Sequence, residues 1–337
     1  MALKPEDRAY QLVNGFRATQ VVTAAVRSKI PDLLARGPMS VDRLSEETKI
    51  DADRLRRLLR GLVALGVVAE QDDGRFVNTE VGELFREGVP GSRRAAAMVL
   101  VPESYRAWDH FLETIRTGVT GHFLAHGGSL WETLQRDPDF AARFNQAMAS
   151  NSTDVANFVA ASGNFADGAL LVDVGGGKGA LVGGILRSNP RLRGMVCDIP
   201  AGLAETRQYL AELGVADRCS VVEADFFKSL PSGGDAYLLK DIIHDWDDEH
   251  AAVILSVCRR ATGPRGRIMM IERGLPSQVT DDPAHLNSVM TDLHMMVLLG
   301  GRERTLDEFR RLLDGASFKL TRSVPGTPWQ LVEAAAV

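Results

Sequence analysis

Cysteine is scarce in this sequence, and no apolar run is long enough to cross a membrane. The 337 residues include 3 cysteines, Cys197, Cys219 and Cys258, and no two of them stand at Cys-x-x-Cys spacing. An odd number of scattered cysteines argues against a disulfide framework and favours buried free thiols, which are typical of reducing compartments. A membrane-spanning helix needs about 20 consecutive apolar residues. We therefore expect a cytoplasmic protein with no membrane partner.

The sequence also lacks a strong net charge and an apolar segment near its start. The formal net charge is -5, a mildly acidic balance that does not attract nucleic acid over the whole surface. The first residues, MALKPEDRAY, contain no apolar stretch of the kind that forms a secretory signal peptide. Apolar residues make up 45% of the chain, which at this length can build more than one domain.

The first part of the chain, to about residue 163, has the pattern of helices with one small hairpin. Ser40 can cap a short helix over residues 42–47, and a stronger helix begins at Asp51 or Asp53. Apolar residues recur along the second helix at helical spacing: Leu55, Leu58, Leu59, Leu62 and Leu65. Short apolar segments at 67–69 and 75–77 flank a hairpin turn signal, Asp72-Asp73-Gly74. Helices followed by a two-stranded hairpin are typical of a winged helix.

After residue 163, strand-like apolar segments alternate with helical ones. The strands are expected at residues 169–174, 195–197, 220–222, 236–239 and 267–271. Such alternation predicts βαβ units, and therefore an α/β, Rossmann-like domain with a parallel sheet and helices on both faces. Near the end, Thr305 and Glu308 form a capping box that opens a helix over 309–313, which Gly315 closes.

The chain therefore divides into three segments. Residues 1–100 form a mainly α-helical, winged-helix-like domain, and residues 164–337 form the α/β domain. Residues 101–163 form connecting helices, whose large apolar side chains can cover a pocket: Trp108, Phe111, Phe140, Phe144 and Met148.

A glycine-rich segment follows the first strand of the predicted α/β domain. Residues 175–179, Gly-Gly-Gly-Lys-Gly, let the backbone turn sharply and approach a ligand. Asp198 stands about 20 residues later, at the end of the next strand, where a carboxylate can hydrogen-bond a ribose diol. Asp225 ends the third strand, and the Phe226 ring beside it can stack on adenine. Together these features predict an adenosine-containing ligand.

The glycine segment alone does not identify the cofactor. Gly175-x-Gly177-x-x-Ala180 also satisfies the loose dinucleotide fingerprint, so an NAD-dependent oxidoreductase stays open on this pattern. A tight turn that binds no ligand is the simplest structural alternative.

A histidine follows the fourth predicted strand, within the segment KDIIHDWDDE at residues 240–249. Ligands of open α/β sheets bind at the carboxyl ends of the strands, so His244 is expected to face the adenosine as a general base. The acids of residues 245–249 begin a helix over 251–261, and their simplest role is to complement its dipole. Because capping explains them, a metal site of His244, Asp247, Asp248 and His250 is disfavoured, and we expect no metal cofactor.

Four segments together resemble one enzyme family. They are DVGGGKG at 173–179, DIP at 198–200, Lys240 with HDW at 244–246, and GGRERT at 300–305. At these separations they are similar to the motifs of the plant caffeic-acid-type O-methyltransferases and their bacterial relatives in polyketide and antibiotic pathways. The resemblance covers nearly the whole chain. It implies a class I methyltransferase fold, S-adenosylmethionine rather than NAD, S-adenosylhomocysteine as product, and a homodimer formed through the N-terminal domain.

The resemblance also implies roles for particular residues. Five are expected to bind the cofactor: Gly175, Asp198, Asp225, Phe226 and Lys240. His244 is expected to be the base, flanked by Glu272 and Glu303. Four match positions that line the acceptor pocket, although core packing explains the first two equally well: Phe144, Met148, His294 and Met295. The implied reaction is methyl transfer to a hydroxyl, expected to be phenolic, of a small natural-product-like molecule.

Two positions depart from the plant pattern. Lys178 occupies a loop position that is usually small in the plant members, and Leu298-Leu299 stand where those members carry a pocket asparagine. We therefore expect an acceptor other than a plant-type lignin phenol and place the chain among the bacterial members.

A winged helix also raises the alternative of a DNA-binding regulator. Four arginines would lie on its recognition helix: Arg54, Arg56, Arg57 and Arg60. The solvated face of an amphipathic helix needs the same residues. The acidic net charge and the large second domain favour that second interpretation, in which nucleic acid is not a partner.

Overall fold

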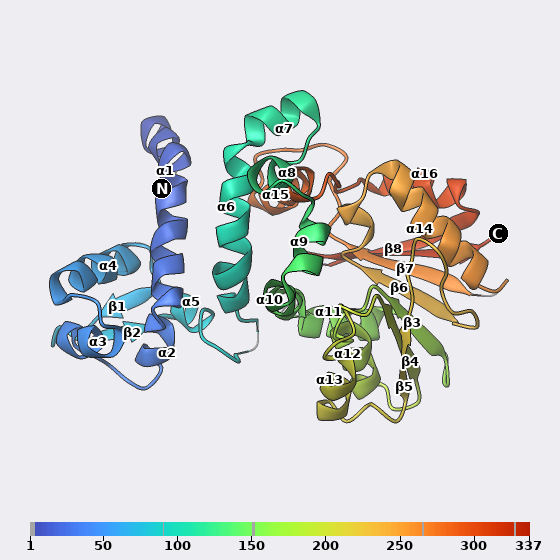
Figure 1. Ribbon diagram of the computed structural model, residues 1–337, viewed down its shortest axis with the longest axis horizontal. Helices are drawn as coiled ribbons and strands as arrows, with labels where there is room; N and C mark the ends of the chain where they lie inside the picture. The colour runs from blue at the N-terminus through green and yellow to red at the C-terminus, as the bar shows by residue number, and fades with distance from the viewer. Residues whose placement is uncertain (1–3, 90, 150–151, 265, 327) are drawn as a thin grey trace. The chain divides into compact units, whose positions relative to one another are not determined.

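The computed structural model describes residues 4–337 except 90, 150–151, 265 and 327 (Figure 1). The chain forms two compact units, residues 1–102 and 103–337. The connecting helices expected at 101–163 fall almost entirely in the second unit. Within the described ranges, no helix combines the length and the apolar character that a membrane span requires.

The N-terminal unit is helical with one small hairpin, as its sequence pattern predicts. The Ser40 and Asp51 side chains cap the third and fourth helices by accepting the Arg43 and Arg54 N–H groups. The two strands pair antiparallel. In chain order the elements are α1 (Pro5–Arg27), α2 (Ile30–Leu34), α3 (Val41–Thr48), α4 (Ala52–Ala64), β1 (Val68–Glu70), β2 (Phe76–Asn78), α5 (Glu80–Glu83) and the π-helix η1 (Ala96–Leu100).

The leucine spacing of α4 turns one face of this helix into the core of the unit. Leu55, Leu59 and Leu62 are fully buried together with Leu44 of α3 and Phe76 of β2. The arginines of the same helix are exposed: Arg54, Arg56, Arg57 and Arg60. They form the solvated face that the amphipathic pattern predicts.

A seven-stranded sheet forms the centre of the second unit, in the order β5-β4-β3-β6-β7-β9-β8. The strands β3 to β7 run parallel. The strand order reverses at β3, and ligands of open α/β sheets bind beside such a switch point. In chain order the strands are β3 (Leu170–Val174), β4 (Arg193–Asp198), β5 (Cys219–Glu223), β6 (Ala236–Lys240), β7 (Arg267–Glu272), β8 (Phe318–Pro325) and β9 (Gln330–Ala336).

Helices cover both faces of this sheet, so the prediction of an α/β, Rossmann-like domain is confirmed (Figure 1). Ile185 belongs to the buried core on one face, and Phe309 belongs to the core on the other. Cys197, Cys219 and Cys258 are buried free thiols, as their scattered positions predict. The covering helices are α11 (Ser152–Ser162), α12 (Ala180–Ser188) and α13 (Thr206–Glu212) on the first face, and α14 (Asp248–Ala261) and α16 (Leu306–Gly315) on the second.

The C-terminal part differs in two details from the sequence-based expectation. Strands β8 and β9 were not among the expected strands, and β9 runs antiparallel to both β7 and β8. The short connection between β8 and β9 suits an antiparallel pair, since a parallel pair would require a long crossover. Helix α16 begins at the predicted capping box of Thr305 and Glu308. It includes Gly315, and the left-handed position after the helix is taken by Ser317, with a φ of 58°.

Three of the remaining helices of this unit meet at one close contact. An added β-carbon on Gly121 would lie 2.2 Å from the Ala107 carbonyl oxygen and 3.1 Å from Val297 Cγ1. Only glycine allows α6, α8 and α15 to approach so closely. These helices and their neighbours are α6 (Val101–Asp109), α7 (Phe111–Thr117), α8 (Gly121–His126), α9 (Leu130–Arg136), α10 (Pro138–Ala149), the 3-10 helix η2 (Ile243–Asp245) and α15 (Pro283–Leu298).

Candidate active site

The glycine-rich segment packs tightly between the end of β3 and the turn that carries His244. Gly175 and Gly179 have φ values of 66° and 77°, in the left-handed region that favours glycine. An added β-carbon on Gly175 would lie 2.6 Å from Ile242 Cδ1 and 3.4 Å from the Phe226 ring. The structure thus places Phe226 directly beside Gly175, although the two residues belong to different loops.

Asp198 lies at the end of β4 and holds the glycine-rich segment in place. Its Oδ2 accepts a hydrogen bond from the Gly177 N–H at 2.9 Å, and its Oδ1 accepts one from the Ile199 N–H at 2.7 Å. Burial raises the pKa of this carboxyl above its ordinary value. Each carboxylate oxygen has a second lone pair, so Asp198 can also accept hydrogen bonds from a ribose diol beside the segment.

Asp225 and Phe226 follow β5. The Asp225 Oδ1 accepts the Phe227 N–H at 2.9 Å, and hydrogen bonding to Lys228 lowers the pKa of Asp225. The Phe226 ring belongs to an aromatic group with Phe227 and Trp246, whose ring centroids lie 5.1 Å and 6.4 Å away. An aromatic wall next to a glycine-rich segment suits the flat face of adenine.

Lys240 ends β6, the strand next to β3. Its ammonium pairs with the Asp241 carboxylate and lies 5.8 Å from the centroid of the Trp329 ring. Burial would raise the pKa of Asp241, but the charges of Lys240 and His244 hold it at about 2. The positive charge of Lys240 is therefore already shared with a carboxylate at this edge of the sheet.

His244 lies in η2 and is only 6% exposed. Its Nδ1 lies 2.7 Å from Glu303 Oε1 and 3.7 Å from Glu272 Oε2. Because an ionised carboxylate only accepts hydrogen bonds, Nδ1 carries the proton that faces Glu303, and the neutral ring keeps its lone pair on Nε2. That Nε2 lies 3.4 Å from Asp245 Oδ1. The structure therefore brings together the predicted base and both predicted acids.

The acids around His244 raise its pKa. Burial raises the pKa of Glu272 to about 8 and that of Asp245 to about 7. Burial by itself would lower the pKa of His244, but Glu272, Glu303 and Asp245 outweigh it and raise this pKa well above 6.5. A raised pKa makes the His244 imidazole a stronger proton acceptor than a free imidazole.

Both flanking acids are positioned by hydrogen bonds that involve backbone N–H groups. Glu272, the last residue of β7, accepts the Ile243 N–H at 2.9 Å through Oε1. The Glu303 N–H donates to Asp292 Oδ1 at 2.9 Å. Within the part of the chain that the structure describes, the second oxygen of each acid, Oε2, has no hydrogen-bond partner. Each acid can therefore accept one more hydrogen bond in the site.

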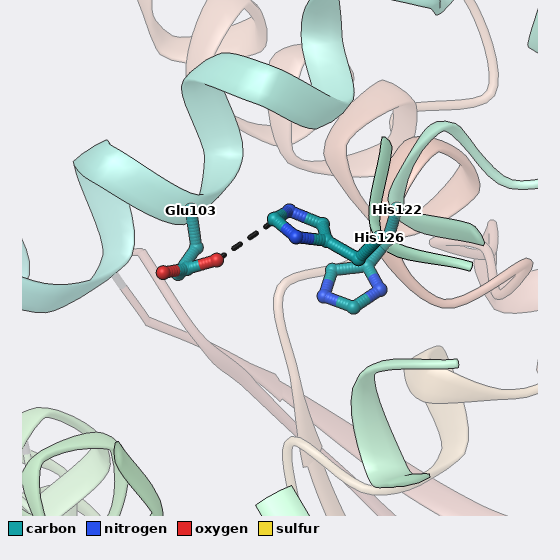
Figure 2. Close-up of side chains that lie close together, drawn as sticks. All are labelled: Glu103, His122 and His126. Carbon is teal, nitrogen blue, oxygen red and sulfur yellow. Dashed lines mark ion pairs between the residues drawn. The ribbon is translucent and has the colours of Figure 1, made fainter. Parts of the chain in front are cut away.

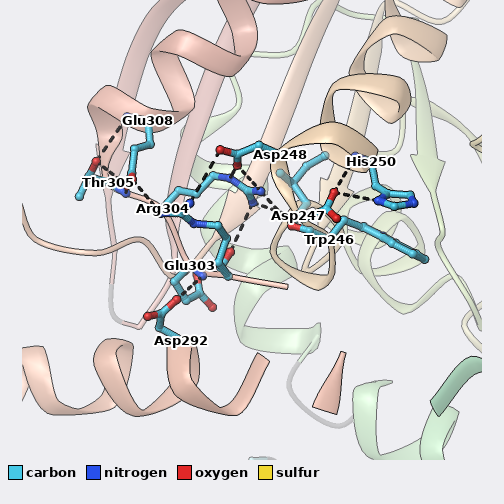
Figure 3. Close-up of polar contacts among 11 residues, drawn as sticks. Trp246, Asp247, Asp248, His250, Asp292, Glu303, Arg304, Thr305 and Glu308 are labelled. Carbon is cyan, nitrogen blue, oxygen red and sulfur yellow. Dashed lines mark hydrogen bonds and ion pairs between the residues drawn. The ribbon is translucent and has the colours of Figure 1, made fainter. Parts of the chain in front are cut away.

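The segments HDWDDE and GGRERT dock against each other (Figure 3). The Arg302 N–H donates to the His244 carbonyl oxygen at 2.8 Å. An added β-carbon on Gly301 would lie 2.1 Å from that same oxygen, so a side chain does not fit there. The joint occurrence of the two motifs in the sequence thus has a physical reason, because one segment supports the backbone that carries His244.

Arg304 strengthens the same docking, as Figure 3 shows. Its guanidinium is fully buried and donates to the Ile243 and Trp246 carbonyl oxygens at 2.9 Å and 2.8 Å. It also pairs with Asp248 at 2.8 Å. The planar guanidinium therefore holds both sides of the His244 turn, a role that the sequence analysis did not assign to it.

The acids after His244 have two different roles. Asp247 caps α14 by accepting the His250 N–H at 2.8 Å, and Asp248 and Glu249 lie in the first turn, as the helix-dipole interpretation predicts. Asp245 instead lies in η2, with its side chain only 15% exposed and next to His244 Nε2. Sequence reasoning missed Asp245 because nothing in a run of acids indicates which one turns inward.

The predicted acceptor-pocket residues lie on two helices. On α10, Phe144 packs against Phe140 with ring centroids 6.3 Å apart, whereas Met148 is 38% exposed. On α15, Met295 is buried and His294 is half-buried. The packing of Phe144 on Phe140 also fits the core-packing alternative.

Trp108 fixes the proton of His294, a link between α6 and α15 that the sequence analysis did not make. The Trp108 Nε1–H donates to His294 Nδ1 at 2.9 Å. Because the indole only donates, Nδ1 must be unprotonated and the hydrogen of His294 sits on Nε2. Burial and the charge of His244 lower the pKa of His294 to about 4. His294 is therefore a neutral hydrogen-bond donor near His244.

Two protein-family models match this chain. A model of the O-methyltransferase domain matches residues 108–319, and a model of the O-methyltransferase dimerisation domain matches residues 10–88. The first match includes the glycine-rich segment, His244 and Glu303. The second falls within the N-terminal unit and assigns it to dimerisation rather than to DNA binding.

Individual relatives share nearly the full length of the chain. A phenazine O-methyltransferase from Lysobacter antibioticus is 37% identical, over 94% of this chain and 91% of that relative. A phenazine-1-carboxylate N-methyltransferase from Pseudomonas aeruginosa is 33% identical, over 93% of this chain and 92% of that relative.

A solved structure identifies the cofactor. It is an O-methyltransferase from neocarzinostatin biosynthesis in complex with S-adenosylmethionine and 2-hydroxy-5-methyl naphthoic acid. It shares 29% identity and a TM-score of 0.80 with this chain, over 95% of this chain and 96% of its own. The chain therefore belongs to the O-methyltransferase family that carries an N-terminal dimerisation domain, and it is an S-adenosylmethionine-dependent O-methyltransferase.

Proposed function

We propose that this enzyme methylates a phenolic hydroxyl of an aromatic small molecule in a bacterial secondary-metabolite pathway, with His244 as the general base. The contact of 2.7 Å between His244 Nδ1 and Glu303 Oε1 carries the proposal, because it leaves the lone pair of Nε2 free to accept a proton. The relative from Lysobacter antibioticus, named for a phenazine, supports an aromatic acceptor. When bound, S-adenosylmethionine supplies an electrophilic methyl carbon on a positively charged sulfur.

The surroundings of His244 reduce the cost of deprotonating a phenol. A phenol has a pKa near 10 and a free histidine one near 6.5, so proton transfer between them costs roughly 5 kcal/mol. Glu272, Glu303 and Asp245 raise the pKa of His244, and each unit of increase lowers that cost by about 1.4 kcal/mol. The imidazolium that forms is stabilised by the buried Glu303 carboxylate.

Other side chains position the two reactants in this proposal. The cofactor is held by residues at the ends of four strands: Gly175, Asp198, Asp225, Phe226 and Lys240. His294 donates its Nε2–H to the acceptor, while Phe144 and Met295 contact the aromatic rings. The assignment of Met148 to the acceptor pocket rests on the family resemblance alone. The catalytic work of these residues is to align oxygen, methyl carbon and sulfur.

An amine acceptor is the competing possibility, because the relative from Pseudomonas aeruginosa is named as an N-methyltransferase. A neutral amine has its own lone pair and needs less help from a base. The buried pair of His244 and Glu303 therefore favours a hydroxyl.

A matched series of acceptors tests the proposal. Hydroxylated phenazines and naphthoates are compared with their amino analogues, and S-adenosylhomocysteine formation is measured. We expect turnover of the hydroxyl compounds, and we expect His244→Ala to reduce it by at least about 100-fold, the lower range for a general base. S-adenosylhomocysteine binding, measured by calorimetry, should be nearly unchanged in that variant.

The control is His285→Ala, which removes a histidine that is hydrogen-bonded to Thr280. Faster turnover of the amino analogues, or a His244→Ala variant as active as His285→Ala, would contradict the proposal. Loss of cofactor binding in His244→Ala would show that His244 contributes to the cofactor site instead.

The dimerisation domain further supports a homodimer. Helix α1 exposes apolar side chains of Tyr10, Leu12 and Val13, at 64%, 67% and 75%. Exposed apolar side chains of this kind are what a second copy of the chain would cover. Sedimentation of the purified protein should give the mass of two chains, and Leu12→Lys with Val13→Lys should shift it toward one.

A further inference from the structure

Helices α6 and α8 bring one carboxylate and two imidazoles together outside the catalytic residues (Figure 2). Glu103, His122 and His126 each offer one ligand atom, and these atoms all lie within 4.8 Å of one another. Two imidazole nitrogens with one carboxylate oxygen form a ligand set that suits zinc. We propose that Glu103, His122 and His126 form a binding site for a divalent transition metal, with zinc as the best-fitting ion.

The two histidines lie on one face of α8 because they stand four positions apart in the sequence. Their ring centroids are 4.6 Å apart. His122 is fully buried, and its Nδ1 lies 3.1 Å from the Gly128 carbonyl oxygen. A carbonyl only accepts, so Nδ1 carries the hydrogen and Nε2 presents its lone pair. Zinc-binding histidines are oriented in the same way by an outer carbonyl or carboxylate.

Two buried ring nitrogens lack a hydrogen bond in this cluster. Among the described residues, His122 Nε2 and His126 Nε2 have no hydrogen-bond partner. Buried polar atoms without partners are rare in folded proteins and call for a physical explanation. An ion pair between protonated His126 and Glu103 accounts for only one of these nitrogens. A metal ion accounts for both, because each nitrogen then becomes a ligand.

The distances suit an ion after a small adjustment. Ligands at 2.0–2.1 Å from a tetrahedral zinc lie about 3.4 Å from one another. Glu103 Oε2 and His126 Nε2 are already 3.5 Å apart. The other pairs, within 4.8 Å, need side-chain movements of about 1 Å. The Glu103 side chain is 33% exposed, so an ion and a fourth ligand such as water can reach the site from solvent.

The site would stabilise the helix that orients His294. Glu103 and Trp108 both lie on α6, and Trp108 donates the hydrogen bond that fixes the His294 proton. A bound ion would tie α6 to α8, next to the close contact of Gly121 with the Ala107 carbonyl. The proposed ion is therefore structural. It takes no part in methyl transfer, for which no metal cofactor is expected.

A second group of possible ligands has to be distinguished in any test. Asp241, His244 and Glu272 also offer atoms within 4.8 Å of one another. Their atoms are already engaged, since Asp241 pairs with Lys240 and His244 Nδ1 contacts Glu303. The variant His244→Ala disrupts this group and leaves the cluster of Glu103, His122 and His126 intact.

The experiment measures zinc binding by the full-length protein. The chelator-treated enzyme is titrated with zinc chloride alone in a calorimeter, and bound zinc is then counted by mass spectrometry of the metal. We expect one zinc per chain. Glu103→Gln and His126→Ala should each weaken binding by at least about tenfold, since even outer partners of metal ligands contribute 10- to 100-fold. His244→Ala should bind zinc like the unmodified enzyme.

The matched controls are Glu113→Gln and His110→Ala. His110 and Glu113 form a similar pair, with Nδ1 and Oε2 3.9 Å apart. Substitution of either residue is expected to leave zinc binding unchanged. Cobalt added to the unmodified enzyme supplies a test without any variant, because tetrahedral nitrogen and oxygen ligation gives strong visible absorption. Absence of bound zinc and of this absorption would overturn the proposal. So would equal binding by Glu103→Gln and Glu113→Gln, or a loss confined to His244→Ala.

Discussion

A β-carbon on Gly301 would lie 2.1 Å from the carbonyl oxygen of His244. The two residues are far apart in the sequence, yet the backbone of one leaves room only for the backbone of the other. The neighbouring Arg302 N–H donates to the same oxygen at 2.8 Å. The position of the proposed base therefore depends on a glycine that has no chemical role itself.

Gly301→Ala should reduce both stability and turnover. The added methyl group meets backbone rather than a flexible side chain, so η2 or the GGRERT segment must shift, at a cost of about 1–3 kcal/mol. We expect a lower midpoint of urea unfolding and a kcat reduced at least tenfold. Gly315→Ala is the control, because an added β-carbon there meets nothing within 4 Å. Equal stability of the two variants would contradict the argument.

The pH dependence of turnover should reflect the raised pKa of His244. The base acts only when neutral, so activity rises as the pH rises through the pKa of the folded enzyme. Since Glu272, Glu303 and Asp245 raise this pKa well above 6.5, the acid limb of kcat/KM should have its midpoint above that value. A midpoint at or below 6.5, measured with a phenol that does not ionise in this range, would speak against His244 as the base.

Glu303→Gln should move that acid limb to lower pH. The amide keeps the shape of the side chain but removes a negative charge 2.7 Å from His244 Nδ1, so the pKa of His244 falls. We also expect kcat to fall by roughly tenfold to 100-fold, because the imidazolium loses its counter-charge. Glu249→Gln, in the exposed first turn of α14, is the control and should leave the pH profile in place. An unmoved profile in Glu303→Gln would remove Glu303 from the proposed mechanism.

Trp108→Phe should raise the KM for the acceptor without weakening S-adenosylhomocysteine binding. The phenyl ring can still stack on Phe111, 5.1 Å away by ring centroids, but the donor to His294 Nδ1 is lost. One hydrogen bond contributes about 1 kcal/mol, so a roughly fivefold increase in KM is expected. Nitrogen chemical shifts of His294 should show a mixture of tautomers.

Trp131→Phe is the matched control for this substitution. The Trp131 Nε1 has no hydrogen-bond partner among the residues that the structure describes, and its ring stacks on Trp246 with centroids 5.7 Å apart. Removing this N–H should therefore leave the KM for the acceptor close to its original value. If both variants raise KM equally, the smaller ring causes the increase, and the His294 tautomer does not.

The sequence by itself predicted the features that depend on neighbouring residues. The leucine spacing of α4, the caps at Ser40 and Thr305 and the alternation of strands and helices are local patterns, and each appears in the structure. The order of motifs along the chain also predicted the family, which the family models confirm. Local patterns suffice here because hydrogen bonding within a turn and burial of one face depend on spacing along the chain.

Only the tertiary structure decided which side chains meet across the fold. Trp108 and His294 are 186 residues apart, and His244 and Glu303 are 59 residues apart, yet each pair lies within hydrogen-bonding distance. The inward turn of Asp245 and the cluster of Glu103 with two histidines likewise depend on packing between helices and loops. No spacing rule predicts these contacts, because they form where elements that are distant in the sequence pack against one another. The sequence determined the family and the elements, and tertiary packing determined the protonation and hydrogen bonding of the site.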